Sequence, residues 1–80
     1  MLKVSVISPE KVLYEGEAAS VVAPAYDGEV GILTGHAPMM TLLGTGSLRI
    51  GGGQSFQIAG GFMQVVDDTV RVVTEKAIAG

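Results

Sequence analysis

Apolar and polar residues alternate in short runs along most of the chain. Leu2, Val4 and Val6 alternate with Lys3 and Ser5, so one side of this run is apolar and the other is polar. Side chains of a β-strand point alternately to its two faces, and a period of two therefore predicts a half-buried strand. The same alternation recurs at residues 30–32, 48–50, 56–58 and 70–72.

Turn-forming residues separate these runs. Gly51-Gly52-Gly53 predicts a hairpin between the runs at 48–50 and 56–58, and Asp67-Asp68 predicts a second hairpin. Gly60-Gly61 predicts a sharp bend or a bulge, because glycine adopts the required backbone angles at little cost.

Two segments need a separate argument. Residues 20–23 form an apolar run that we expect to end at Pro24, because proline cannot donate a hydrogen bond to a strand ladder. Residues 39–43 have partly helical spacing, but they lie between Pro38 and Gly44 and are too few for a stable helix. We therefore expect a strand at 39–43.

Many short strands spaced about 8–12 residues apart predict an all-β fold, an antiparallel sandwich or barrel. The 80 residues are enough for one domain, 1–80, and they contain no internal repeat. Hydrophobic residues make up 48% of the chain and charged residues only 16%, a composition that excludes a disordered chain.

Charge and cysteine content narrow the class of function. Five basic and eight acidic residues give a net charge of -3, which argues against nucleic-acid binding because that requires a basic face. The absence of cysteine excludes disulfides, thiol catalysis and thiolate metal sites. No apolar run has the length of a secretory signal or approaches the roughly 18 residues of a membrane-spanning helix. We expect a soluble acidic protein.

The sequence offers little catalytic chemistry. His36 is the only histidine, and no cysteine could join it in a zinc or iron site of three or four ligands. The pairs Glu15/Glu17 and Asp27/Glu29 could each share a strand face, but an acid-base pair needs a carboxylate shielded from water. Solvated faces are the expected alternative, most clearly for Glu15/Glu17, whereas Asp27-Gly28-Glu29 opens a glycine-rich loop where functional residues tend to lie.

No cofactor site is expected either. The glycine-rich segments 44–47 and 51–53 lack the lysine of a phosphate-binding loop and a following helix. A lipoyl-type carrier domain is the alternative function, because such domains are all-β and modify a lysine beside an acidic residue, as in Glu75-Lys76. Lys76 would then have to lie on an exposed hairpin between two strands, yet it is four residues from Gly80. We expect no catalytic residue, metal or cofactor; a small hydrolase remains a further alternative.

One segment resembles a known family. Residues 24–38, Pro-Ala-Tyr-Asp-Gly-Glu-Val-Gly-Ile-Leu-Thr-Gly-His-Ala-Pro, are similar to the hallmark segment of the epsilon subunit of F-type ATP synthases. The resemblance continues over nearly the whole chain, in residues 8–16, 43–50, 58–65 and 70–77.

This resemblance implies a flattened antiparallel β-sandwich of about ten strands. It also implies a non-catalytic rotor subunit that binds the gamma subunit, rests on the ring of c subunits and couples proton flow to ATP synthesis. Contact with the membrane would be indirect, through the c ring. The implied location is the cytoplasmic face of a bacterial inner membrane or, alternatively, the stromal side of a chloroplast thylakoid.

The resemblance also assigns partner contacts residue by residue. Asp27, Glu29 and His36 match positions facing the c ring, where charge-assisted bonds to arginines of the ring are plausible chemistry. Ser8, His36 and Met40 match positions on the gamma side. Two structural alternatives stay open, because Met40 could belong to the core and Ser8 could cap the end of a strand.

Members of the family typically continue into a C-terminal helical hairpin that inhibits ATP hydrolysis. This sequence ends at Gly80, about where that hairpin would begin. The resemblance therefore implies a form that couples rotation but lacks the inhibitory helices.

Overall fold

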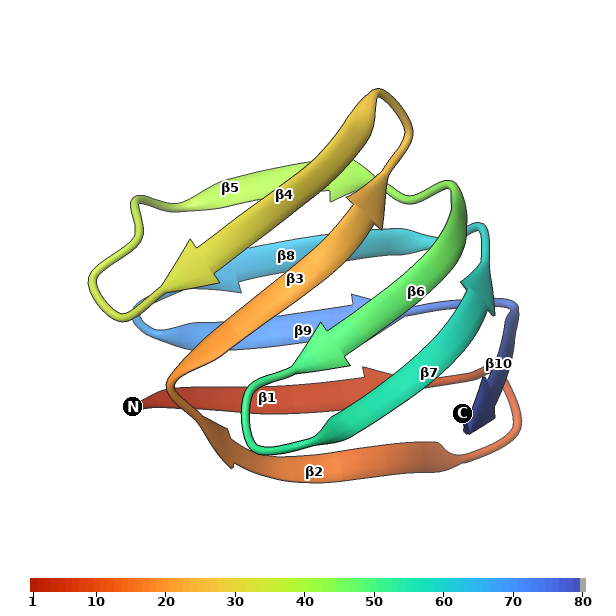
Figure 1. The fold of residues 1–80 in the computed structure, drawn as a ribbon, viewed down its shortest axis with the longest axis horizontal. Coiled ribbons are helices and arrows are strands. Elements are labelled where there is room, and N and C mark those ends of the chain that lie inside the picture. Colours follow the sequence, from red (N-terminus) through yellow and green to blue (C-terminus); the bar gives the residue numbers. More distant parts are fainter. Residues whose placement is uncertain (80) are drawn as a thin grey trace.

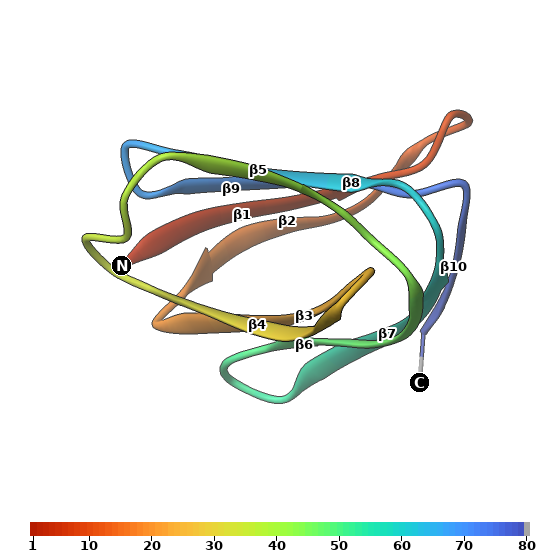
Figure 2. The same ribbon diagram turned by 90° about the horizontal axis from the view of Figure 1, so that it is seen from above.

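Two five-stranded sheets face each other in a computed structural model that describes residues 1–79. Figure 1 shows the strands of both sheets, and Figure 2 shows the two layers from above. The strand order is β2-β1-β9-β8-β5 in the first sheet, called sheet A, and β10-β7-β6-β3-β4 in the second, called sheet B. The strands are β1 Leu2–Ile7, β2 Val12–Ala18, β3 Ser20–Ala25, β4 Gly28–Leu33, β5 Met39–Leu42, β6 Thr45–Ile50, β7 Gln54–Ala59, β8 Phe62–Val66, β9 Thr69–Val73 and β10 Lys76–Ala79.

The all-β sandwich predicted from the alternation is confirmed. Along β1 the residues Leu2, Val4 and Val6 are buried, whereas Lys3 is exposed, and β9 alternates in the same way. The inner faces of both sheets supply one continuous core of small and medium-sized apolar side chains. Its buried members are Leu2, Val4, Val6, Ala18, Val21, Ala23, Ile32, Leu43, Leu48, Ile50, Phe56, Ile58, Met63, Val65, Val70 and Val72.

The predicted turns are also confirmed. Residues 51–53 connect β6 to β7, and Asp67-Asp68 connect β8 to β9. Both aspartates have positive φ, 49° and 58°, as expected for a two-residue hairpin of type I′. The strand expected at 39–43 is β5, which covers Met39–Leu42 and pairs with β8, whereas Leu43 forms only an isolated bridge with Ala25.

One pair of strands differs from the antiparallel expectation. β1 runs antiparallel to β2 but parallel to β9, with Val4 opposite Val70 and Val6 opposite Val72. A hairpin fixes the direction of β2 relative to β1. No such constraint applies to β9, because the chain passes through sheet B between β1 and β9.

Two local expectations were wrong. β3 continues through Pro24 to Ala25, because β3 pairs with β6 only at Val21 and Val22 and the missing N–H of Pro24 lies beyond that ladder. Glu29 does not lie in a glycine-rich loop. The turn is confined to residues 26–27, and Glu29 belongs to β4, opposite Pro24.

A buried hydroxyl joins the β7–β8 bend to the chain after β9. Thr74 is 1% exposed, and its Oγ1 lies 2.8 Å from the carbonyl oxygen of Gly60 and 2.9 Å from that of Lys76. Its backbone N–H donates to the oxygen of Ile7 at 2.9 Å. The bend packs so tightly here that a Cβ at Gly61 would clash with the backbone oxygen of Val73. This corner fixes β8, β9 and β10 relative to one another.

Replacing Thr74 by valine should therefore destabilise the fold. Thr74→Val keeps the side-chain volume but removes the buried hydroxyl, whose one proton can bond to the carbonyl oxygen of Gly60 or of Lys76, at a cost of about 1–3 kcal/mol in the free energy of unfolding. Thr69→Val, at an exposed position of β9, is the matched control and should change stability by less than about 0.5 kcal/mol. Urea unfolding measures both; equal stabilities of the two variants would contradict this role of Thr74.

Candidate binding surfaces

Glu29 lies on the outer face of sheet B, where it forms an ion pair. The Nη2 atom of Arg49 in β6 lies 3.2 Å and 3.3 Å from the two carboxylate oxygens. The two side chains are about half exposed, 55% for Arg49 and 56% for Glu29. An exposed pair of this kind contributes only about 0–1 kcal/mol, so a cation on a partner could displace Arg49. Asp27 precedes β4 in the exposed turn and has no hydrogen bond to its carboxylate among the described residues.

His36 lies in the β4–β5 connection, at the end of β4 that is far from Asp27 and Glu29 (Figure 1). Its backbone N–H donates to the oxygen of Leu33 at 3.1 Å, and its Nδ1 lies 2.7 Å from the oxygen of Ala37. Within residues 1–79 there is no group of three or more His, Asp or Glu side chains that could hold a metal ion. The structure thus separates His36 from the two acidic residues, and a partner that touched all three would have to extend along β4.

Met40 lies on the outer face of sheet A and is 64% exposed. The core alternative for Met40 is therefore wrong; its neighbour Met39 packs against the core instead. Leu42, two residues further along β5, is also 64% exposed, and Val66 at the end of β8 is 41% exposed. These three side chains form what we call the apolar half of the outer face of sheet A.

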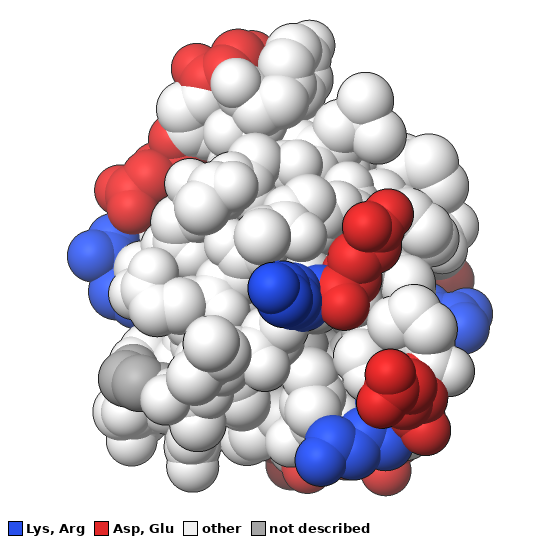
Figure 3. All heavy atoms as spheres, turned by 90° about the vertical axis from the view of Figure 1, so that its right-hand side faces the viewer, with Lys and Arg blue, Asp and Glu red and all other residues white. Residues whose placement is uncertain are grey.

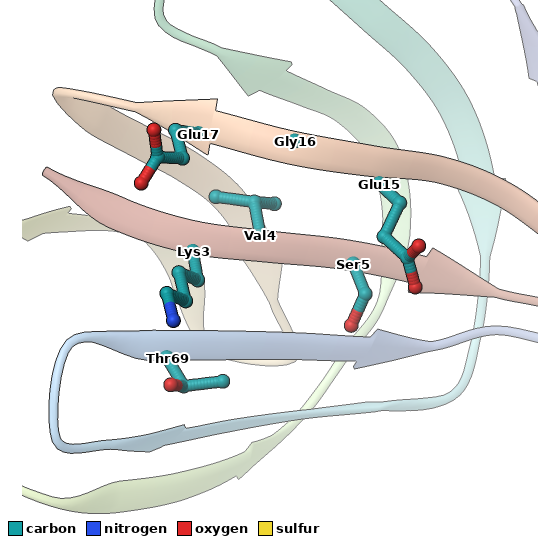
Figure 4. Close-up of a pocket in the computed structure, with 7 residues that line it drawn as sticks. All are labelled: Lys3, Val4, Ser5, Glu15, Gly16, Glu17 and Thr69. Atoms are coloured by element: carbon teal, nitrogen blue, oxygen red, sulfur yellow. The ribbon is translucent and has the colours of Figure 1, made fainter.

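The other half of this face is polar. Glu15 and Glu17 of β2 lie opposite Ser5 and Lys3 of β1, and Lys3 lies opposite Thr69 of β9. Figure 4 shows Glu17 beside Lys3 and Glu15 beside Ser5, around a shallow hollow of about 510 Å³. Both glutamates are exposed, as the solvated alternative predicts. Neither carboxylate is shielded from water, so the pair has no environment for acid-base catalysis.

Ser8 supports the turn between β1 and β2. Its Oγ lies 3.2 Å from both the N–H and the carbonyl oxygen of Lys11, and its backbone N–H donates to the same oxygen at 2.9 Å. The strand-end alternative for Ser8 is therefore confirmed. In sheet A, β9 and β8 separate β1 from β5, so Ser8 does not lie beside Met40.

Lys76 is the first residue of β10 and pairs with Ala59 of β7. A carrier lysine must lie at the tip of an exposed hairpin, where its cofactor can move. A position inside a paired strand does not provide that mobility, and the structure gives no support to the carrier alternative.

Basic side chains form no continuous patch on the side of the sandwich seen in Figure 3. Blue and red side chains lie apart or in adjacent pairs on a mainly uncharged surface. This side of the molecule therefore presents no continuous basic surface. Residues 1–79 contain no helix long and apolar enough to cross a membrane.

Comparison with known proteins identifies the family. The family model described as "ATP synthase, Delta/Epsilon chain, beta-sandwich domain" matches residues 1–80. The chain belongs to this family. It is 48% identical over 77 residues to the ATP synthase epsilon chain of Leptospira borgpetersenii and 37% identical over 82 residues to that of Gloeothece citriformis. These matches cover 92% and 99% of this chain but only 61% and 59% of those relatives.

Solved structures agree with the family assignment. A chain in the structure of the Euglena gracilis mitochondrial ATP synthase with OSCP, F1 and c-ring superposes with a TM-score of 0.89 at 25% identity, over 98% of this chain and 52% of that one. A chain of the Tetrahymena thermophila central stalk and c-ring has a TM-score of 0.84 at 17% identity, over 96% and 65% of the two chains, and shows the shared fold.

Several residues of these surfaces could not be predicted from the sequence. The sequence did not identify Arg49 as the partner of Glu29, because that pairing depends on which strands lie side by side. It also did not identify Leu42 and Val66 as exposed apolar residues, because their exposure depends on which strand is at the edge of the sheet. The alternation alone gives two faces for each strand and does not say which face is covered. The sequence does contain a signal for Leu42. Residues 39–43 are all apolar except Thr41, and a strand with one buried face needs an apolar residue only at every second position.

Two methionines test the assignment of the outer face. Met40→Ala should change the free energy of unfolding by less than about 0.5 kcal/mol, because the side chain is exposed. Met63→Ala, at a fully buried position of β8, should cost about 2–5 kcal/mol because it opens a cavity. Urea unfolding of both variants is the measurement. A large loss of stability in Met40→Ala would contradict the assignment of Met40 to the outer face.

Proposed function

We propose that this chain is a non-catalytic central-stalk domain that links a gamma subunit to the c ring of a proton-translocating F-type ATP synthase. The observation that carries the proposal is the row of exposed apolar side chains on β5, in a member of the epsilon-chain sandwich family. Exposed apolar side chains that gather on one face of a protein are typical of surfaces that bind another protein. Coupling, not catalysis, is the function that such a surface on a rigid sandwich serves best.

The gamma subunit is the proposed partner of the apolar half of sheet A. Met40, Leu42 and Val66 supply the apolar area, and the polar half beside them supplies a rim of mixed charge. Protein interfaces generally have this arrangement of an apolar centre and a polar rim. We propose His36 as a further contact on this side, because the β4–β5 connection leads directly into β5. Ser8 is proposed as a gamma contact from the family resemblance alone.

The c ring is the proposed partner of the β3–β4 end of sheet B. Asp27 and Glu29 bring two carboxylates to this end, and neither carboxylate is buried. An arginine of the ring could take the place of Arg49 beside Glu29 and form a charge-assisted pair. His36 belongs to the same proposed contact only if the ring surface reaches the other end of β4.

Stiffness is the mechanical requirement of this function. Torque transmitted through the domain tends to shift one sheet relative to the other. The shared core and the Thr74 corner oppose such a shift, and residues 1–79 contain no helical hinge between the two proposed contact regions. Because these residues are strands and turns, we further propose that they couple rotation without inhibiting ATP hydrolysis. The proposed site is a peripheral position on an energy-coupling membrane, a bacterial inner membrane or a thylakoid.

Two exposed apolar side chains test the gamma contact. Leu42→Asp should weaken binding of the chain to the gamma subunit from the same organism by about tenfold or more, because it places a carboxylate in the apolar centre of the interface. Ile78→Asp is the matched control, since Ile78 is 67% exposed but lies on β10, at the edge of sheet B farthest from β4. Calorimetric titration with purified gamma measures both; equal weakening by the two variants would contradict the assignment to sheet A.

Two glutamates test the ring contact. Glu29→Lys should weaken attachment to the c ring and uncouple proton flow from ATP synthesis, while unfolding stability changes by no more than about 1 kcal/mol. Glu17→Lys is the matched control, because it makes the same charge change on β2. It also places two positive charges next to each other, since Glu17 lies opposite Lys3 just as Glu29 lies beside Arg49. Proton pumping and ATP synthesis in reconstituted vesicles are the readouts. Normal coupling in Glu29→Lys, or equal uncoupling in Glu17→Lys, would contradict the ring contact.

A further inference from the structure

A hydrogen bond connects the β8–β9 hairpin of sheet A to the loop after β4 of sheet B. The carboxylate Oδ1 of Asp68 accepts the backbone N–H of Gly35 at 2.7 Å, between residues 33 positions apart. Bonds of this length to a carboxylate are among the stronger hydrogen bonds in proteins. The contact therefore joins the two layers of the sandwich at the end opposite the β3–β4 turn (Figure 1).

The hairpin alone does not explain an aspartate at this position. Asp67 and Asp68 both have positive φ, and the second residue of such a turn is most favourably glycine. Asp68 therefore costs backbone energy that glycine would not. Its backbone oxygen accepts the N–H of Lys3 at 2.8 Å, a bond that any residue could form. Only the bond to Gly35 requires the carboxylate.

The loop that receives this bond has few other connections. Residues 34–38 join β4 to β5, and among residues 1–79 His36 bonds to Leu33 before the loop and to Ala37 within it. In the part of the chain that the structure describes, the bond from Gly35 to Asp68 is the only hydrogen bond that joins residues 34–38 to a distant segment. Its loss would free the loop on both sides of His36.

We propose that Asp68 is a positioning residue for the gamma interface. By holding Gly35, its carboxylate fixes His36 and the direction in which the chain enters β5, where Met40 and Leu42 are exposed. A loop held in its bound conformation loses less conformational entropy on binding, so the partner binds more tightly. This inference rests on the proposed function, because it assumes that the surface carrying His36 and Met40 binds gamma.

Three variants separate the contact from the stability of the hairpin. Asp68→Gly removes the acceptor but places a favoured residue in the turn, so the hairpin should be at least as stable as before. Asp68→Asn keeps an oxygen acceptor and tolerates positive φ. Asp67→Gly is the matched control, since it makes the same change one residue earlier, where the structure shows no side-chain hydrogen bond within residues 1–79.

The first readout needs no partner. Amide hydrogen exchange of Gly35, measured by NMR on the 80-residue chain, should become about tenfold faster in Asp68→Gly, about what is expected when a net stabilisation near 1.4 kcal/mol is lost. Asp67→Gly should match the wild type, and Asp68→Asn should lie between it and Asp68→Gly. Unchanged Gly35 exchange in Asp68→Gly would overturn the proposal.

The second readout is the Kd for the purified gamma subunit. Asp68→Gly should bind about tenfold more weakly, Asp68→Asn within about threefold of the wild type, and Asp67→Gly equally well. Equal Kd values for Asp68→Gly and Asp67→Gly, in chains of equal thermal stability, would overturn the positioning role. If the wild-type chain itself binds no gamma, the proposed function fails, whereas the exchange of Gly35 still decides whether Asp68 holds the loop.

Discussion

The fold depends on burying the inner face of each five-stranded sheet against the inner face of the other. The core uses small and medium-sized residues, mostly Val, Ile, Leu and Ala, with Phe56 as its one buried aromatic residue among those described. Such a thin core leaves the outer faces of both sheets free. Burial of the two inner faces therefore stabilises the fold and also leaves two separate outer surfaces. A domain that links two partners needs two such surfaces.

The edge strands decide where those surfaces carry chemistry. β5 closes one edge of sheet A and β4 the corresponding edge of sheet B (Figures 1 and 2). β5 presents Met40 and Leu42, whereas β4 presents Glu29 on its outer side. The connection between these two strands carries His36, and the Asp68 contact holds it. One edge of the sandwich thus contains an exposed apolar region, an exposed charged region, and the loop between them.

Much of this arrangement could be predicted from the sequence because it depends on local pattern. The alternation at Leu2, Val4 and Val6 and the turn at Asp67-Asp68 each have a physical cause within a few residues. The continuation of β3 through Pro24 and the parallel pairing of β1 with β9 could not, because both depend on which strand lies alongside. The same holds for the site: Glu29 is conspicuous in the sequence, but Arg49 becomes its partner only when β6 packs beside β3.

A cysteine-labelling experiment tests most directly that the outer face of sheet A binds gamma. The chain has no cysteine, so each substitution introduces the only thiol. Single cysteines at Met40, Leu42 and Val66 of sheet A, and at Val22 and Gln57 of sheet B, would be labelled with a thiol reagent with and without bound gamma. We expect slower labelling with gamma at positions 40, 42 and 66 and unchanged labelling at positions 22 and 57. Protection of positions 22 and 57 alone would contradict it.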